Sequence, residues 1–228
     1  MAPRSTFSRT MILAAAILCM AACITDLSLI YWFGKQVSGY SHLTNTLSSL
    51  GISSSPVAGA VTVWSVILGV IFIFFGFGFR EAFHQYGKPV NKAIWLMALY
   101  GLGECIASGI FRADKINGNL TDIAILHDLL GGIGVIAMLL FPLLMRKICT
   151  AFSSPLFFRF SGIIFALGLI STLLFSFRLE YFAGSFLYTY CGLWQRIFLL
   201  NSYFYFFVIA FMMLHEVKSF HQIKNKTQ

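Results

Sequence analysis

Charged residues are scarce in this chain of 228 residues. They make up 11% of it, and only eight residues are acidic, whereas a soluble domain carries about 25% charged residues. So few charges cannot cover a surface that faces water on all sides. The composition therefore excludes an ordinary soluble domain, and the acidic residues that remain need an explanation.

Familiar metal and cofactor motifs are also missing. The five cysteines form no Cys-x-x-Cys pair, and the five histidines form neither His-x-x-x-His nor His-Glu-x-x-His. These absences argue against a zinc site and against a disulfide framework. No two histidines lie at one depth to ligate haem, and no apolar run contains the lysine that retinal would need. We therefore expect no metal and no cofactor.

The sequence has instead six long apolar runs separated by short polar segments. Each run can cross the hydrocarbon core of a bilayer as an α-helix, which takes about 20 residues. The first run exceeds the apolar core of a signal peptide, so we expect it to remain as an anchor helix. The sequence predicts an all-α, polytopic membrane protein: a single domain over residues 1–228 that forms a six-transmembrane-helix bundle. The predicted spans are residues 11–33, 56–79, 93–111, 122–144, 157–177 and 194–214.

The distribution of basic residues predicts the orientation. One side of the membrane receives Arg4, Arg9, Arg80, Lys88, Lys92, Arg146, Lys147, Arg159, Lys218, Lys224 and Lys226, and the other receives only Lys35, Arg112, Lys115 and Arg178. Short loops rich in Lys and Arg stay cytoplasmic, so both termini are predicted to be cytoplasmic. The net charge of +8 is thus a topology signal, and we expect no nucleic-acid partner.

Four ionisable residues are predicted to share one layer near the outer ends of the spans. Asp26 and Glu104 each lie seven residues before the end of a run, which is roughly 10 Å along a helix. His127 and Asp128 enter the fourth run at a similar depth. Charges are costly there, so these groups must pair or face a hydrated cavity. We favour a cavity over a lattice of ion pairs, because apolar packing would replace such a lattice without loss of stability. The available counter-charges are Arg112, Arg178 and Arg196.

The first outer loop, residues 34–55, carries an unusual polar run. Leu43, Leu47 and Leu50 recur at helical spacing, which predicts a short interfacial helix. We expect this helix to end at Gly51 in a left-handed conformation. The Asn45 amide and the Ser48 hydroxyl would then lie at the mouth of the cavity.

Several short motifs resemble one family in order and spacing over most of the chain. They are Tyr40-Ser41, Asn45-Thr46-Leu47-Ser48-Ser49-Leu50-Gly51, Gly109-Ile110-Phe111, Asp114, His127 and Gly192-Leu193-Trp194-Gln195-Arg196. The chain resembles the six-helix prokaryotic integral membrane proteins of domain-of-unknown-function family nine-nine-eight. It departs from the family at Ser49, often an acid there, and at Arg112, which replaces a proline. The resemblance implies a six-helix bundle in a prokaryotic cytoplasmic (inner) membrane and a weak connection to lipids, and it brings no established activity.

The expected function is binding of a membrane lipid or another amphiphile. Abundant aromatics near the outer ends of the last two spans suit a membrane interface, and arginines there would hold an anionic head bidentately. The predicted ligand-binding residues in the outer-leaflet half are Asn45, Ser48, Asp26, Glu104, Arg112, Asp114, His127 and Arg196.

Other functions remain open at this point. A membrane-embedded hydrolase or transferase acting on a lipid would use His127 with Asp114 or Glu104 as acid and base. A zinc site would need His42 and His127 with a carboxylate such as Asp114 or Asp128. A small-solute or proton-coupled transporter would use Asp26 and Glu104, although no polar path continues inward from them.

Overall fold

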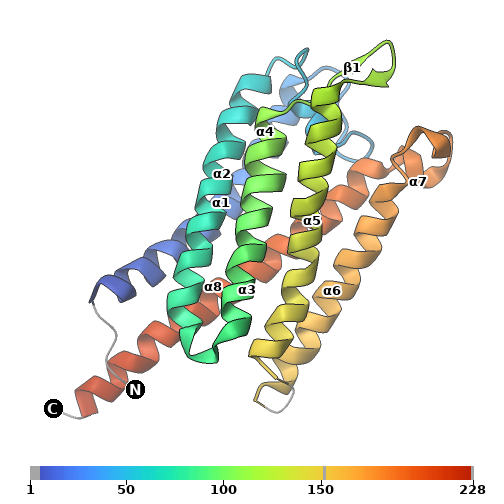
Figure 1. Cartoon of the computed structure of the whole chain (residues 1–228). Coiled ribbons are helices and arrows are strands. Elements are labelled where there is room, and N and C mark those ends of the chain that lie inside the picture. The colour runs from blue at the N-terminus through green and yellow to red at the C-terminus, as the bar shows by residue number, and fades with distance from the viewer. Residues whose placement is uncertain (1–5, 151–152, 227–228) are drawn as a thin grey trace.

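Six long helices make up most of the molecule in the computed structural model, which describes residues 6–150 and 153–226 (Figure 1). Six helical segments within these residues are long and apolar enough to cross a membrane. The predicted class, an all-α polytopic membrane protein, is confirmed. The long helices are α1 (Thr6–Gln36), α2 (Ala58–Phe83), α3 (Lys88–Leu99) with its continuation, α5 (Asp122–Ile148), α6 (Pro155–Ser176) and α8 (Cys191–Lys226).

The observed helices extend beyond most of the predicted spans. Helix α1 starts before residue 11 and α8 continues well past residue 214. Hydropathy marks the part of a helix that fits the bilayer core, whereas flanking polar residues remain helical outside it. The predicted runs are therefore the apolar centres of longer helices.

The third span changes its helical geometry midway. Helix α3 passes into a π-helical segment, Tyr100–Ala107, before a last α-helical turn, α4 (Ser108–Ile110). A π-segment turns each following side chain to a different angle around the helix axis, and such segments are frequent at functional sites. This segment carries Glu104 and therefore sets the direction in which its side chain points.

Small residues bring the helices into close contact. A Cβ atom on Gly101 would lie 2.7 Å from the Gly69 carbonyl oxygen of α2, and one on Gly134 of α5 would lie 2.8 Å from the Glu104 Cβ atom. Backbones approach this closely only where side chains are absent, as is common between helices in membranes. The third span is thus packed tightly between α2 and α5.

The two ends of the bundle differ. The start of α1 and the end of α8 lie at the same end of the bundle, called here the terminal end (Figure 1). The opposite loop end carries residues 37–57, a hairpin of β1 (Lys115–Ile116) and β2 (Asn119–Leu120), and the short helix α7 (Phe186–Thr189). Asn117 and Gly118 turn this hairpin with positive φ angles of 51° and 82°.

The first loop departs from its predicted form. Only a single 3-10 turn, Leu47–Leu50, is present, and Gly51 has a φ angle of −97°. The predicted left-handed end at Gly51 is therefore wrong. The loop is held by tertiary contacts rather than by a helix of its own, since the Leu193 amide of α8 donates to the Leu43 carbonyl at 2.9 Å.

Candidate functional site

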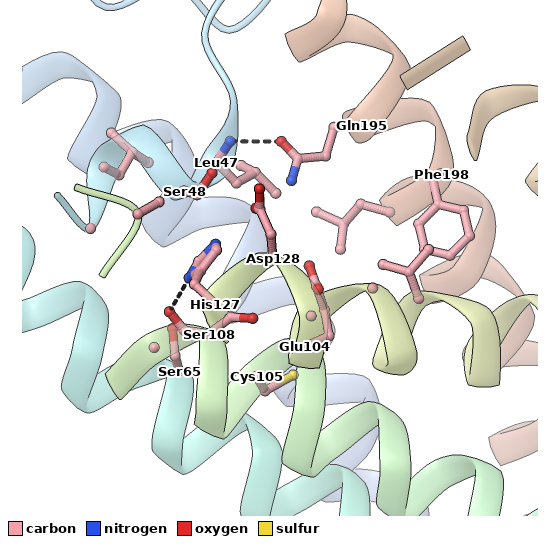
Figure 2. Close-up of a pocket in the computed structure, with 18 of the residues that line it drawn as sticks. Leu47, Ser48, Ser65, Glu104, Cys105, Ser108, His127, Asp128, Gln195 and Phe198 are labelled. Carbon is pink, nitrogen blue, oxygen red and sulfur yellow. Dashed lines mark hydrogen bonds between the residues drawn. The ribbon is translucent and has the colours of Figure 1, made fainter. Parts of the chain in front are cut away.

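A cavity of about 430 Å³ occupies the loop-end half of the bundle (Figure 2). All six spans and the first loop contribute to its wall. Ligand pockets generally have volumes of about 300–1,000 Å³ and combine an apolar lining with a few polar groups. The polar and ionisable side chains that line this cavity include Asp26, Ser48, Trp64, Ser65, Tyr100, Glu104, Ser108, Arg112, His127, Asp128, Arg178, Gln195 and Tyr203.

Asp26 of α1 lies on the cavity wall, and both of its carboxylate oxygens already accept hydrogen bonds. Its Oδ1 accepts a hydrogen bond from Trp64 Nε1 of α2 at 2.7 Å, and its Oδ2 accepts one from the Tyr203 hydroxyl of α8 at 2.7 Å. The residue is only 6% exposed. These hydrogen bonds supply the donors that a buried carboxylate needs. They also join α1 to α2 and to α8.

Glu104 has a different environment, although it lies in the same layer. Its side chain points into the cavity (Figure 2), and no described residue forms a hydrogen bond with its carboxylate. A Cβ atom on Gly131 of α5 would lie 3.0 Å from Glu104 Oε2. The carboxylate thus lies against bare helix backbone, next to the charges of Asp128 and Arg178.

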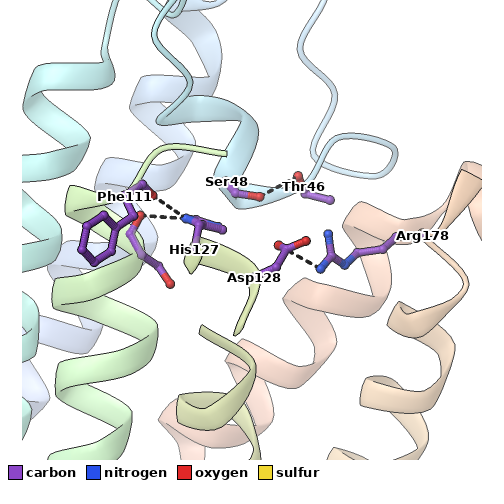
Figure 3. A network of polar contacts seen from close by, with 7 residues as sticks. Thr46, Ser48, Phe111, His127, Asp128 and Arg178 are labelled. Carbon is purple, nitrogen blue, oxygen red and sulfur yellow. Dashed lines mark hydrogen bonds and ion pairs between the residues drawn. The ribbon is translucent and has the colours of Figure 1, made fainter. Parts of the chain in front are cut away.

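The hydrogen bonds of His127 define its tautomer. Its Nδ1 lies 2.7 Å from the Phe111 carbonyl oxygen and 3.0 Å from the Ser108 carbonyl oxygen (Figure 3). Both carbonyl oxygens only accept hydrogen bonds, so Nδ1 carries the proton. In the neutral ring Nε2 is then a hydrogen-bond acceptor. Two backbone carbonyls at the C-terminal end of the third span therefore orient the His127 ring on the cavity wall.

Two further polar contacts lie beside His127 (Figure 3). Asp128 forms an ion pair with Arg178 at 3.0 Å, in which both side chains are 31% exposed. The hydroxyls of Thr46 and Ser48 lie 3.1 Å apart in the first loop. The ion pair joins α5 to the segment after α6, and partial exposure limits what it adds to stability.

Arg196 and Asn45 lie outside the cavity, contrary to the prediction. Arg196 Nη1 donates to the Asn45 carbonyl at 2.8 Å, and its Nη2 donates to the Tyr40 hydroxyl and contacts His42 Nδ1 at 3.3 Å. Consecutive residues of a helix point about 100° apart. Gln195 takes the cavity side of α8, where its Oε1 accepts the Leu47 amide at 2.7 Å, so Arg196 points to the loop instead.

The pKa values of the loop residues around Arg196 are shifted. Burial raises the pKa of the Tyr40 hydroxyl, against the opposing effect of the Arg196 charge. Burial lowers the pKa of His42, and the charge of Arg196 lowers it further. We call Tyr40, His42, Asn45 and Arg196 the loop latch, because their contacts fasten residues 37–57 to α8.

Asp114 also lies away from the cavity. Its Oδ1 accepts the Ser53 amide at 2.7 Å and its Oδ2 accepts the Ser53 hydroxyl at 2.5 Å, and these hydrogen bonds lower its pKa. Arg112 does line the cavity, while its Nη1 donates to the Ser53 hydroxyl at 3.2 Å. The pair of His127 and Asp114 is therefore not brought together as the acid–base hypothesis required.

The predicted site residues thus fall into two groups: some line the cavity, whereas Asn45, Asp114 and Arg196 do not. Within the described chain, no three His, Cys, Asp or Glu residues gather as a metal site. Asp26, Ser48, Glu104, Arg112 and His127 line the cavity. The prediction missed Gln195, Trp64 and Tyr203, and the available signal for the last two was an amphipathic aromatic placed inside a span rather than at its interface.

The fold defines a multi-pass membrane protein, with six candidate spans in the part of the chain that the structure describes. The chain belongs to the family described as Protein of unknown function (DUF998), whose model matches residues 13–212. No curated protein and no solved structure matches it.

Proposed function

We propose that the protein binds an amphiphile, with the polar head inside the cavity and the chain directed towards the lipid. The observation that carries this proposal is that one cavity joins buried polar groups to residues on the outer surface. Ile136 of α5 and Leu179 after α6 line the cavity, and each is 56% exposed. A ligand with both polar and apolar parts suits such a wall.

The apolar wall has the composition that an acyl or alkyl chain requires. It includes Ile30, Phe33, Leu47, Leu50, Val61, Leu68, Val135, Phe175, Phe198 and Leu199. Burying a chain there removes it from contact with polar heads and water at the membrane surface. A chain would enter sideways from the bilayer where the exposed side chains of Ile136 and Leu179 border the cavity. If both termini are cytoplasmic, as the basic residues predict, the cavity belongs to the outer leaflet half.

The packing of the other half favours binding over transport. Phe72, Phe75, Phe79, Phe141 and Phe206 are each no more than 1% exposed and form a continuous aromatic core below the cavity. A transporter needs polar groups or water along its path. These five rings carry no polar atom and pack against one another below the cavity, so a ligand would enter and leave on the cavity side.

One observation favours an enzyme as the second candidate. The Nε2 atom of His127 is a free acceptor in the neutral ring and could take a proton from a bound hydroxyl. A hydrolase or transferase would need a nucleophile beside it, and no hydrogen bond links His127 to a hydroxyl or carboxylate among the described side chains. Binding is therefore the function that we propose first.

Gly132 of α5 allows a direct test. It lines the cavity, and a Cβ atom there would meet no atom within 4 Å, so Gly132→Phe fills the cavity without a backbone clash. Gly59 of α2 has equally open space outside the cavity, which makes Gly59→Phe the matched control. Lipids retained after purification in detergent would be identified and quantified by mass spectrometry.

We expect Gly132→Phe to retain at least about tenfold less of one amphiphile, because filling the site removes on the order of 1.4 kcal/mol or more of binding free energy. Gly59→Phe should retain as much as the native protein. Equal amounts of the same lipids in all three proteins would overturn the proposal. Loss of the bound lipid on incubation, prevented by His127→Ala, would establish the enzyme instead.

A further inference from the structure

Two hydrogen-bond acceptors on the cavity wall, on Glu104 and His127, have no donor among the described residues. Both oxygens of Asp26 already have donors, but the Glu104 carboxylate has none among the described residues. Since His127 Nδ1 donates to two carbonyls, Nε2 of the neutral ring is a second acceptor. A ligand that donates hydrogen bonds would satisfy both groups.

The arginines near the cavity already have polar partners in the protein. Arg178 pairs with Asp128, and Arg112 donates to the Ser53 hydroxyl and lies near the Asp114 charge. Arg196 belongs to the loop latch. The side-chain amide of Gln195 is a remaining neutral donor, because its Oε1 accepts the Leu47 amide. Each guanidinium keeps further N–H groups, but the charges of Arg178 and Arg112 already lie beside Asp128 and Asp114, so an anionic head would compete with those carboxylates.

The formal charges on the cavity wall also argue against an anionic head group. The wall contains three carboxylates, Asp26, Glu104 and Asp128, and the cations Arg112 and Arg178. When all three carboxylates are ionised, the wall has one more negative than positive charge, and Arg112 is also shared with Asp114. Uncompensated charges inside a membrane are costly, and a cation held by Glu104 would reduce that cost.

Glu104 and His127 lie within reach of one small head group. The Glu104 carboxylate lies against Gly131, which is one helical turn, about 6 Å, from His127 along α5. Ser108 lies one turn beyond Glu104 in the third span, and its carbonyl binds His127. Figure 2 shows Glu104 and His127 on neighbouring helices at the same cavity.

We infer that the head group of the amphiphile is a protonated amine that donates to the Glu104 carboxylate and to His127 Nε2. An ammonium group has three donors and no acceptor, which complements the Glu104 carboxylate and His127 Nε2. Hydrogen bonds between charged groups are also stronger than neutral ones. This inference rests on the proposed function and replaces the anionic head that the sequence predicted.

The test compares three probes that share one alkyl chain: hexadecylamine, hexadecanol and hexadecanoate. Binding of radiolabelled hexadecylamine to the full chain in phosphatidylcholine nanodiscs is measured, with the other two as competitors and empty discs as the background. Glu104→Gln removes the charge and keeps the shape. Asp122→Asn makes the same change at the exposed start of α5, outside the cavity, and is the matched control.

Hexadecylamine should bind most tightly, and Glu104→Gln should weaken it at least about tenfold, the usual effect of losing a charged hydrogen bond. Asp122→Asn should leave it unchanged, and Glu104→Asp, which keeps the charge, should restore part of the affinity. Tighter binding of hexadecanoate, or equal amine binding by Glu104→Gln, would overturn the amine inference and leave amphiphile binding intact. If no probe binds saturably, both the inference and the proposed function fail.

Discussion

The terminal-end half and the loop-end half of the bundle are built from the same six helices but differ in their interiors. The terminal-end half is filled by aromatic side chains in mutual contact, such as Phe141 with Phe79, Tyr205 and Phe206. The loop-end half contains a cavity with a carboxylate, that of Glu104, which has no hydrogen-bond partner among the described residues. Large rings fill the space between helices in one half, whereas in the other half Gly131 and Gly132 leave the α5 backbone bare on the cavity wall.

The packing of one half can stabilise the fold while the other half contains a cavity. Packing of apolar side chains stabilises helix contacts in a bilayer, where the hydrophobic effect between helices is weak. The aromatic core supplies such contacts, and Ser161 adds a hydrogen bond to the Tyr205 hydroxyl at 2.8 Å between α6 and α8. The loop-end half can therefore hold buried polar groups without loosening the fold.

The largest expected effect concerns the side of the membrane that each half faces. Asn117→Cys at the tip of the hairpin should react with an impermeant thiol reagent added outside intact cells, and Thr150→Cys at the terminal end should not. The native cysteines supply a background that the unmodified protein measures, since four of them are buried. Labelling of Thr150→Cys alone would place the cavity in the inner leaflet half and reverse the predicted orientation.

The second prediction compares one substitution in the two halves. Phe141 is 1% exposed within the aromatic core, whereas Phe198 is 8% exposed and lines the cavity. Phe141→Ala should destabilise the protein by about 3–5 kcal/mol, because it removes contacts and leaves a new void. Phe198→Ala should cost roughly half as much, because its ring already borders empty space.

Equilibrium unfolding in mixed detergent micelles measures both free energies. Leu156→Ala, an exposed site at 82%, is the control and should change stability by less than about 0.5 kcal/mol. If Phe198→Ala proves as costly as Phe141→Ala, the two halves are packed equally well, and the cavity is not a distinct environment.

The sequence predicts the spans well and the site only in part. Run length and hydropathy are sufficient for the spans, since few other structures satisfy the backbone in lipid. Depth along a helix also follows from counting residues, and this placed Asp26, Glu104 and His127 in one layer. Rotation about the helix axis does not follow from counting, which is why Arg196 was assigned to the cavity instead of Gln195.

The π-segment shows the limit most clearly. It has no sequence signal of its own, and it changes the angle at which Glu104 leaves the third span. Partners from distant segments, such as Trp64 and Tyr203 on Asp26, depend on the packing of three helices. The sequence likewise predicts Asp114 in the cavity, whereas the Ser53 amide of the first loop binds it outside the cavity.

The smallest expected effect concerns the loop latch, which holds the first loop over the cavity. His42 Nδ1 accepts a hydrogen bond from Arg196 at 3.3 Å, its ring stacks on Tyr31, and Lys35 lies 4.4 Å from the centre of that Tyr31 ring. Protonation of His42 would abolish the acceptor and set two cations side by side. Burial and the Arg196 charge lower the pKa of His42 below its ordinary value, which is about 6.5.

The detached loop therefore binds more protons than the attached loop between the lowered pKa and about 6.5. Attachment should be strongest above that pH and weaken as the pH falls through it, with no further change below the lowered pKa. The pKa of Asp114 is lowered, so its carboxylate stays ionised and keeps its hydrogen bonds from Ser53 over this range. Hydrogen exchange of residues 37–57 between about pH 5 and 7.5 would measure the opening. His42→Gln keeps an acceptor for Arg196 but cannot be protonated, so its exchange, after correction for the intrinsic rate, should not depend on pH. An unchanged pH dependence in this variant would show that another group controls the loop.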